Sequence, residues 1–173
     1  MILTGNEIQR QKDLGNIIIQ PFCSSQISTN SYDLRLSNTL IKYKNSDAID
    51  PKIKQEYIKI EIPDEGFLIN KGEFYLGTSL ETIGSNDFVP ILHAKSGTAR
   101  MGLFVHITAD LIDIGSIGKL TFQLYATLPV IVYPNMLLAQ VTFWKTFGEI
   151  KLYDGKYQNS TEPRISQIYK DFV

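Results

Sequence analysis

The stretch Gly118–Ala126, GKLTFQLYA, combines a strand pattern with one polar side chain that could take part in chemistry. Its alternation predicts a strand with the apolar residues on one face and Thr121, Gln123 and Tyr125 on the other. The side chain of Gln123 is bulky and uncharged. It is therefore either a satisfied polar residue of a sheet or a group that occupies a catalytic position, and the choice decides which reaction this chain performs.

A second stretch, His93–Gly102 (HAKSGTARMG), is a candidate phosphate-binding segment. A strand is expected to end there, and the turn at Ser96 is followed by residues that can begin a helical turn. Its free backbone N–H groups and hydroxyl, with Lys95 and Arg100 on either side, would form a phosphate cradle. A capped turn with two solvated cations fits the same residues, so both interpretations stay open.

The segment Ala109–Gly118 (ADLIDIGSIG) places two acids and two glycines in a hairpin-like loop before the GKLTFQLYA strand. Asp113 lies between Ile112 and Ile114, where partial burial would suit it to act as a general base. An aspartate that only shapes the turn is the competing interpretation.

Three further stretches carry polar groups. Ser31–Leu36 (SYDLRL) puts Asp33 and Arg35 on the same face of a strand, as an exposed ion pair or as part of a site. Gln140, in the apolar run MLLAQVTF, needs partners because an unsatisfied buried amide costs about 1–3 kcal/mol. The run Lys156–Ser160 (KYQNS) offers a cation, amides and an aromatic ring, in a tail or in a lid over a ligand.

The elements that must position these groups are mostly strands. The spacing Thr4-x-x-Glu7 is that of a capping box, and Gly15 suits a helix end, which predicts a helix over 4–14. Short runs between turn residues predict strands at 17–21, 32–44, 57–62, 67–70, 73–83, 87–95, 103–108, 119–126, 129–133 and 136–144. The pattern favours an all-β sandwich or distorted barrel in one domain, 1–173, with 153–173 as a C-terminal arm.

Composition excludes several classes of function. The net charge is −1 with no long Lys/Arg block, so a nucleic-acid partner is not expected. The single cysteine, Cys23, allows no internal disulfide, and the PCxxC element of zinc-dependent nucleobase deaminases is absent. His93 and His106 are too few and too far apart in sequence for a metal site, and His106 is expected to be a hydrogen-bonded structural residue. No secretory signal or run of membrane-spanning length is present, so a cytoplasmic protein with no membrane partner is expected.

Taken in order, SYDLRL, AKSGTARMGL, TADLIDIGSIGK, MLLAQVTF and DGKYQNS resemble the dCTP deaminase branch of the dUTPase-like family, from about Ile17 to Arg164. The resemblance implies a dUTPase-like distorted β-barrel and a homotrimer with three sites between subunits. It also implies a pyrimidine deoxynucleoside triphosphate as ligand, dCTP or dUTP with dTTP as a candidate inhibitor. Mg²⁺ would come with the triphosphate, and no zinc or protein-held metal is expected.

The resemblance also implies roles for individual residues. Ser96 and Arg100 match the residues that contact the activated water and the phosphates, and Lys95 stands where a phosphate-binding arginine is usual. The other expected substrate contacts are the base and deoxyribose segment, the phosphate-binding amide and the closing arm, matched respectively by Ala109 and Asp113, by Gln140, and by Tyr153, Lys156 and Ser160.

Besides Lys95, three positions depart from the family pattern. Gln123 stands where the deaminases carry the glutamate that moves protons between water and the cytosine ring. Ser116 replaces an aromatic residue under the deoxyribose, which weakens discrimination against ribose, and Ser160 stands where a glutamine is usual. An amide has no proton-transfer equilibrium near neutrality, so deamination is expected to lose about 10²–10⁴-fold in rate.

Three functions are therefore compatible with the sequence. The first is a dCTP deaminase that forms dUTP and ammonia, with Gln123, Ser96, Arg100 and Asp113 at the catalytic positions. The second is a dUTP diphosphatase in which Asp113 orients water towards the α-phosphate. The third is a catalytically inactive trimer that binds nucleotides.

Overall fold

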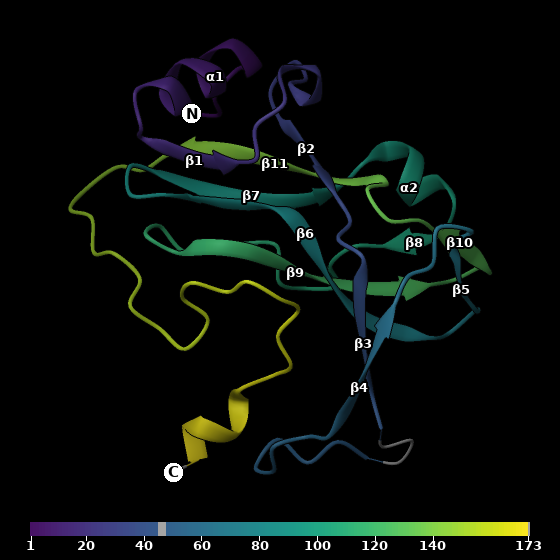
Figure 1. The fold of residues 1–173 in the computed structure, drawn as a ribbon. Coiled ribbons are helices and arrows are strands. Elements are labelled where there is room, and N and C mark those ends of the chain that lie inside the picture. The colour runs from purple at the N-terminus through teal and green to yellow at the C-terminus, as the bar shows by residue number, and fades with distance from the viewer. Residues whose placement is uncertain (45–47, 173) are drawn as a thin grey trace.

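The chain is a β protein with one N-terminal helix, and the computed structural model describes residues 1–44 and 48–172 (Figure 1). Helix α1 (Gly5–Asp13) and the 3₁₀ turn η1 (Ser24–Gln26) precede most of the strands; α2 (Ser96–Arg100) and η2 (Ile168–Phe172) come later. The strands are β1 (Ile17–Gln20), β2 (Tyr32–Arg35), β3 (Thr39–Tyr43), β4 (Tyr57–Glu61), β5 (Phe67–Ile69), β6 (Phe74–Ser85), β7 (Phe88–Ala94), β8 (Leu103–Phe104), β9 (Ile117–Ala126), β10 (Val130–Val132) and β11 (Leu137–Lys145).

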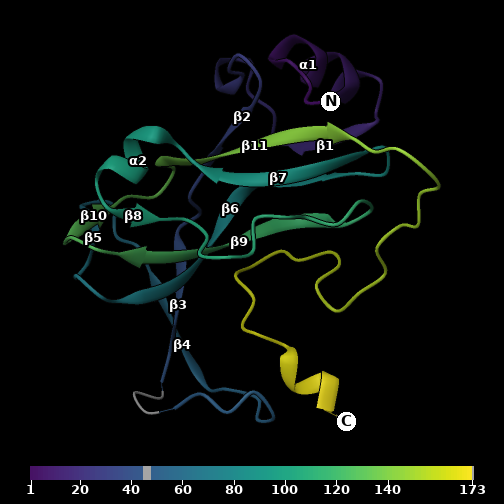
Figure 2. The ribbon, with the colours of Figure 1, turned by 180° about the vertical axis from the view of Figure 1, so that it is seen from behind.

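The strands pair antiparallel in three sheets. The largest has the order β4-β3-β6-β9-β8, with β1 also paired to β6; the others are β2-β11-β7 and β10-β5. Figures 1 and 2 show β7 and β11 lying over β6 and β9, with the β3–β4 hairpin projecting from the body. Alternate residues of both sheets, such as Leu34 and Val141 on one side and Ile83 and Phe122 on the other, meet in one apolar core. The predicted all-β fold is confirmed.

The predicted N-terminal helix is confirmed with its caps. The hydroxyl of Thr4 accepts a hydrogen bond from the N–H of Glu7 at 3.4 Å, and Gly15 takes a φ of +81° just after the helix. Glu7 also bonds the Arg10 guanidinium, which lowers the pKa of that carboxyl to about 2.

Two predicted strands are wrong in extent. The run 32–44 is two strands, because the chain crosses from the β2-β11-β7 sheet to the large sheet between Arg35 and Thr39. The run 103–108 forms only β8, because the ladder to β9 ends where the N–H of Ile107 donates to the side chain of Gln123 at 3.1 Å.

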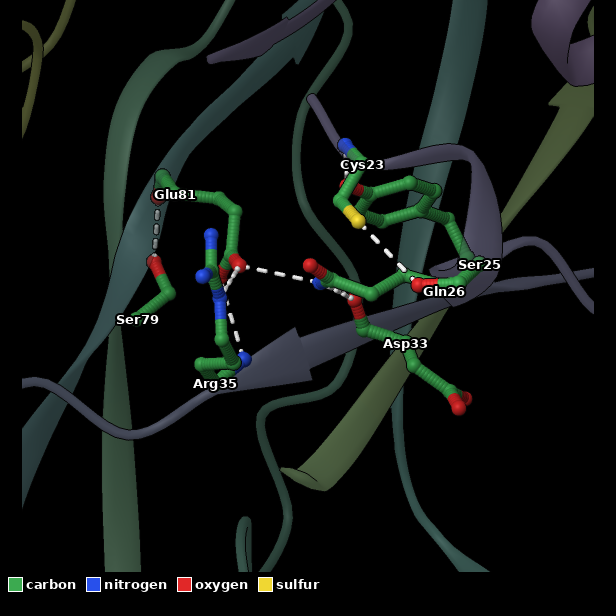
Figure 3. Close-up of polar contacts among 8 residues, drawn as sticks. Cys23, Ser25, Gln26, Asp33, Arg35, Ser79 and Glu81 are labelled. Carbon is green, nitrogen blue, oxygen red and sulfur yellow. Dashed lines mark hydrogen bonds and ion pairs between the residues drawn. The ribbon is translucent and has the colours of Figure 1, made fainter. Parts of the chain in front are cut away.

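A buried carboxylate joins the large sheet to the β2-β11-β7 sheet. Glu81, on β6, is 0% exposed, and its Oε1 accepts from Arg35 Nε at 2.7 Å and from Gln26 Nε2 at 3.0 Å (Figure 3). Its Oε2 accepts from the backbone N–H of Arg35 at 3.0 Å. The predicted ion pair between Asp33 and Arg35 is therefore wrong, because Arg35 pairs with Glu81 and Asp33 pairs with Lys95.

The part of β6 just before and at Glu81 forms a bulge. The register of β6 against β9 shifts between Thr78 and Thr82, so main-chain pairing is interrupted opposite Leu120. Side chains replace it: Ser79 Oγ accepts from the N–H of Leu120 at 2.8 Å, and Thr78 Oγ1 donates to its carbonyl at 3.0 Å. Ser79 Oγ also donates to the carbonyl of Glu81 at 2.6 Å. The bulge lets Glu81 turn inward to Arg35 without loss of hydrogen bonds at β9.

We expect Glu81→Gln to lower the free energy of unfolding by about 3–5 kcal/mol, because it leaves the half-buried charge of Arg35 without its carboxylate. Urea denaturation followed by circular dichroism measures the change. The matched control is Glu61→Gln on the exposed strand β4, expected to change stability by less than about 0.5 kcal/mol. A loss below about 1 kcal/mol for Glu81→Gln would contradict a stabilising role for this ion pair.

Candidate active site

A cavity of about 460 Å³ lies between the large sheet, the loop before β9 and the C-terminal segment. Residues of β3, β6 and β9 form its floor, and residues 153–166 cover it. Of the site residues predicted from the sequence, those that line it are Ala109, Asp113, Gln123, Tyr153 and Ser160, together with the departure Ser116.

Gln123 is held in this cavity by the segment that follows β8. Its main-chain N–H donates to the carbonyl of Val105 at 2.9 Å, and its Oε1 accepts from the N–H of Ile107 at 3.1 Å. Its Nε2 makes no hydrogen bond to any residue within 1–44 or 48–172. Flanking residues Phe122 and Leu124 are fully buried on the opposite face, as the alternation predicts. Gln123 therefore presents amide donors to the cavity.

Asp113 is exposed, so its predicted partial burial is wrong for the single chain. Ile112 packs on the core, but the loop turns outward at the next residue and none of the residues that the structure describes covers the carboxylate. The turn interpretation also holds in part, since the carbonyl of Asp113 accepts from the N–H of Ser116 at 3.0 Å and Gly115 has a φ of +89°. Asp113 is thus both a turn residue and an accessible carboxylate at the cavity.

The predicted arm packs on its own chain (Figure 1, yellow). Its main chain runs beside β9: the N–H of Asn159 donates to Ile117 O at 2.9 Å, and the N–H of Lys119 donates to Ser160 O at 2.7 Å. Gln158, which the sequence analysis did not single out, holds the arm to the loop by donating to Gly115 O and accepting from Ile117 N–H, each at 2.8 Å. An amide flanked by turn residues was the available signal, and it is not specific.

The far end of the arm contributes to the second apolar cluster of the structure. Ile165 is buried against Ile41 and Leu76, and the N–H of Ser166 donates to the hydroxyl of Tyr43 at 3.0 Å. This anchoring closes the cavity on the side of the β3–β4 hairpin.

Lys156 does not line the cavity. Its Nζ donates to both carboxylate oxygens of Asp171, at 2.6 and 2.7 Å, and this contact raises the pKa of Lys156. In the single chain the predicted arm cation is therefore engaged with η2.

The predicted phosphate cradle lies elsewhere, where β7 and β11 meet α2 (Figure 2). The expected helical turn is present, and Arg100 Nη1 donates to Ser96 Oγ at 2.8 Å. Lys95 forms an ion pair with Asp33 on β2. None of these residues lines the cavity of Gln123 in the same chain.

Gln140 completes this group, and its amide is satisfied as expected. Gln140 Nε2 donates to Ala94 O at 3.1 Å, and its Oε1 accepts from Ser31 Oγ at 2.8 Å. The stretches SYDLRL, AKSGTARMGL and MLLAQVTF thus lie side by side, because β2, β11 and β7 are neighbours in one sheet.

The two histidines lie near each other. His93 Nε2 contacts Thr142 Oγ1 at 3.2 Å, and burial, followed by the proximity of His106, lowers the pKa of His93. The prediction that His106 is hydrogen-bonded is wrong for Nδ1, which is buried and has no hydrogen-bond partner in the described part of the chain. Across the described ranges, no three His, Cys, Asp or Glu side chains are grouped to hold a metal ion. None of the helices described is long and apolar enough to cross a membrane.

The fold and the arm-covered cavity define a dUTPase-like β protein. The family model described as dCTP deaminase-like matches residues 2–146, and the chain belongs to that family. It is an enzyme of the dCTP deaminase and dUTPase-like type.

Curated relatives match over nearly the full length. The chain is 44% identical over 174 residues to "dCTP deaminase, dUMP-forming" of Clostridium botulinum (strain Alaska E43 / Type E3), with 99% of each covered. It is 40% identical to the protein of the same name in Hathewaya histolytica, again covering 99% of each. The crystal structure of 2'-deoxycytidine 5'-triphosphate deaminase from Agrobacterium tumefaciens shares the fold, with a TM-score of 0.64 and 20% identity. The match covers 82% of this chain and 47% of that one.

We expect Gly118→Ala to release the arm, because a Cβ there would lie 2.7 Å from the main-chain nitrogen of Ser160. Hydrogen exchange at the amides of Lys119 and Asn159, which bond across this contact, should accelerate at least about tenfold. Gly97→Ala is the control, since its Cβ would meet nothing within 4 Å. Unchanged protection in Gly118→Ala would show that the arm does not depend on this close approach.

Proposed function

We propose that this chain hydrolyses a pyrimidine deoxynucleoside triphosphate, and that the step it retains is the conversion of dUTP to dUMP and pyrophosphate. Deamination of dCTP is slow or absent. The observation that carries the proposal is that one cavity is lined by both an amide, Gln123, and an accessible carboxylate, Asp113.

The name printed for the relatives implies two hydrolytic reactions. Going from dCTP to dUMP requires loss of the amino group as ammonia and loss of pyrophosphate, with one water consumed in each reaction. The relatives' name covers both, which goes beyond the dUTP product expected from the sequence. This chain carries groups suited to only one of the two.

Deamination requires a group that takes a proton from water and delivers one to the cytosine ring. Gln123 cannot do so, because its amide neither gains nor loses protons near neutral pH. Gln123 can still bind the base. Its Nε2 can donate to a carbonyl oxygen of uracil. Its Oε1 accepts from the N–H of Ile107 and has a second lone pair that can accept another hydrogen bond. The amide therefore serves recognition.

Hydrolysis at the α-phosphate needs a base and stabilisation of the leaving pyrophosphate. In this proposal Asp113 orients a water, and Lys95, Ser96, Arg100 and Gln140 are the expected phosphate contacts. Mg²⁺ bound to the triphosphate would neutralise charge on its oxygens.

The two groups must come from different copies, because the cradle does not line the cavity of its own chain. We therefore place the site between subunits of a homotrimer, as the family resemblance implies. An apolar surface is available for association: Leu68 on β5 and Ile131 on β10 are register partners and are 47% and 48% exposed.

A second candidate is dCTP deamination to dUTP and ammonia. It is favoured by the 44% identity, over 99% of both chains, to a relative that bears the deaminase name. Purified enzyme incubated with dCTP or dUTP and Mg²⁺ separates the candidates. Ammonia from dCTP at ordinary enzymatic rates would favour the deaminase. Nucleotide binding with neither product would favour an inactive trimer, and either result would refute the proposal.

Gln123→Glu should raise ammonia release from dCTP by at least about 10²-fold, because it restores a group that exchanges protons. Ammonia is measured by a coupled assay. Gln20→Glu, which adds a carboxylate at an exposed position of β1, is the control and should have no effect. No gain from Gln123→Glu would show that the deaminating machinery is defective at other residues as well.

Asp113→Asn should lower pyrophosphate release from dUTP by about 10²–10⁴-fold while nucleotide binding persists. Asp110→Asn, in the same loop but outside the cavity lining, should stay close to the unmodified enzyme. Equal losses in both variants would indicate damage to the loop instead of loss of a base.

A further inference from the structure

Arg164 is a cation that the arm carries into the cavity and that no sequence motif assigned. It lines the cavity and is half-buried, and its main-chain N–H donates to Thr121 Oγ1 at 3.1 Å. The residues on either side of it, Pro163 and Ile165, are buried and fix the arm at this point. Within residues 1–44 and 48–172, its guanidinium makes no hydrogen bond or ion pair.

Lys119 lines the same cavity from β9. Its main chain is tied to the arm through Ser160 O, and its ammonium group has no bonded partner among the described residues. Asp113 is the only acid among the described lining residues, so the lining carries an excess of positive charge.

A further acid close to both cations is already neutralised. Glu162 forms an ion pair with Lys59, and this contact is the main cause of its lowered pKa, with smaller effects of Arg164 and Lys119. Both cations therefore lie near Glu162, but its carboxylate is bonded to a third. A half-buried guanidinium without a carboxylate favours an external anion, and its planar donors suit phosphate.

We infer that Arg164 and Lys119 form an additional anion-binding subsite, which takes a phosphate group of the nucleotide when the arm is docked. The inference rests on the proposed function for the identity of the ligand. It adds a cation of the arm, beyond the expected contacts of Tyr153, Lys156 and Ser160, to the cradle of Lys95, Ser96 and Arg100.

The test measures binding by calorimetry with dUTP, deoxyuridine and inorganic triphosphate. Arg164→Gln should weaken dUTP and inorganic triphosphate by about 10- to 100-fold and leave deoxyuridine within about twofold, because only the phosphates contact the guanidinium. Arg164→Lys should recover part of the loss. Lys170→Gln removes one positive charge from the same arm outside the cavity and should match the unmodified enzyme.

Unchanged dUTP affinity in Arg164→Gln, an equal loss for deoxyuridine, or an equal loss in Lys170→Gln would overturn the inference. Hydrogen exchange at the Lys119 amide reports whether the arm stays docked in each variant, and a loss that follows undocking alone would also overturn it. If the unmodified enzyme binds inorganic triphosphate through Arg164 but neither binds nor hydrolyses dUTP, the proposed function fails and the subsite stands.

Discussion

The buried carboxylate of Glu81 is the interaction on which the rest of the structure depends. A charge removed from water is tolerated only when it is paired and fully hydrogen-bonded. Glu81 meets that requirement by binding Arg35 on β2 and Gln26 in η1, which joins the two sheets (Figure 3). Its inward turn requires the bulge in β6.

The bulge in turn shapes the floor of the cavity. Where β6 leaves the ladder, β9 is held by side chains at Leu120, and the next residue, Thr121, keeps its hydroxyl for the main chain of Arg164. The arm, the cavity and the buried ion pair therefore all depend on the bulge in β6. The arm covers the polar face of β9 but leaves a cavity between the two, and a ligand can bind in that cavity.

Chemistry at this cavity depends on which protons its groups can move. Gln123 is fixed by the N–H of Ile107 and can only donate or accept hydrogen bonds, whereas Asp113 is an accessible carboxylate at the same wall. In the proposed function this environment serves base recognition and phosphate hydrolysis, and it lacks at residue 123 the carboxylate that deamination requires. That is why similarity over the whole chain does not by itself assign the reaction.

Local patterns in the sequence determined the β class, the capped helix at Thr4 and the strand that carries Gln123, while the family followed from the resemblance of five stretches in order along the chain. Alternation, caps and turn residues act over a few neighbours, so these features need no knowledge of distant contacts. Only the tertiary structure decided that Arg35 pairs with Glu81, that Asp113 is exposed and that the predicted site residues divide between a cavity and a separate cradle. It also brought Arg164 and Lys119 to the lining of one cavity. These outcomes depend on sheet pairing and arm docking between segments far apart in the chain, and their side-chain partners are set by packing, which no local pattern specifies.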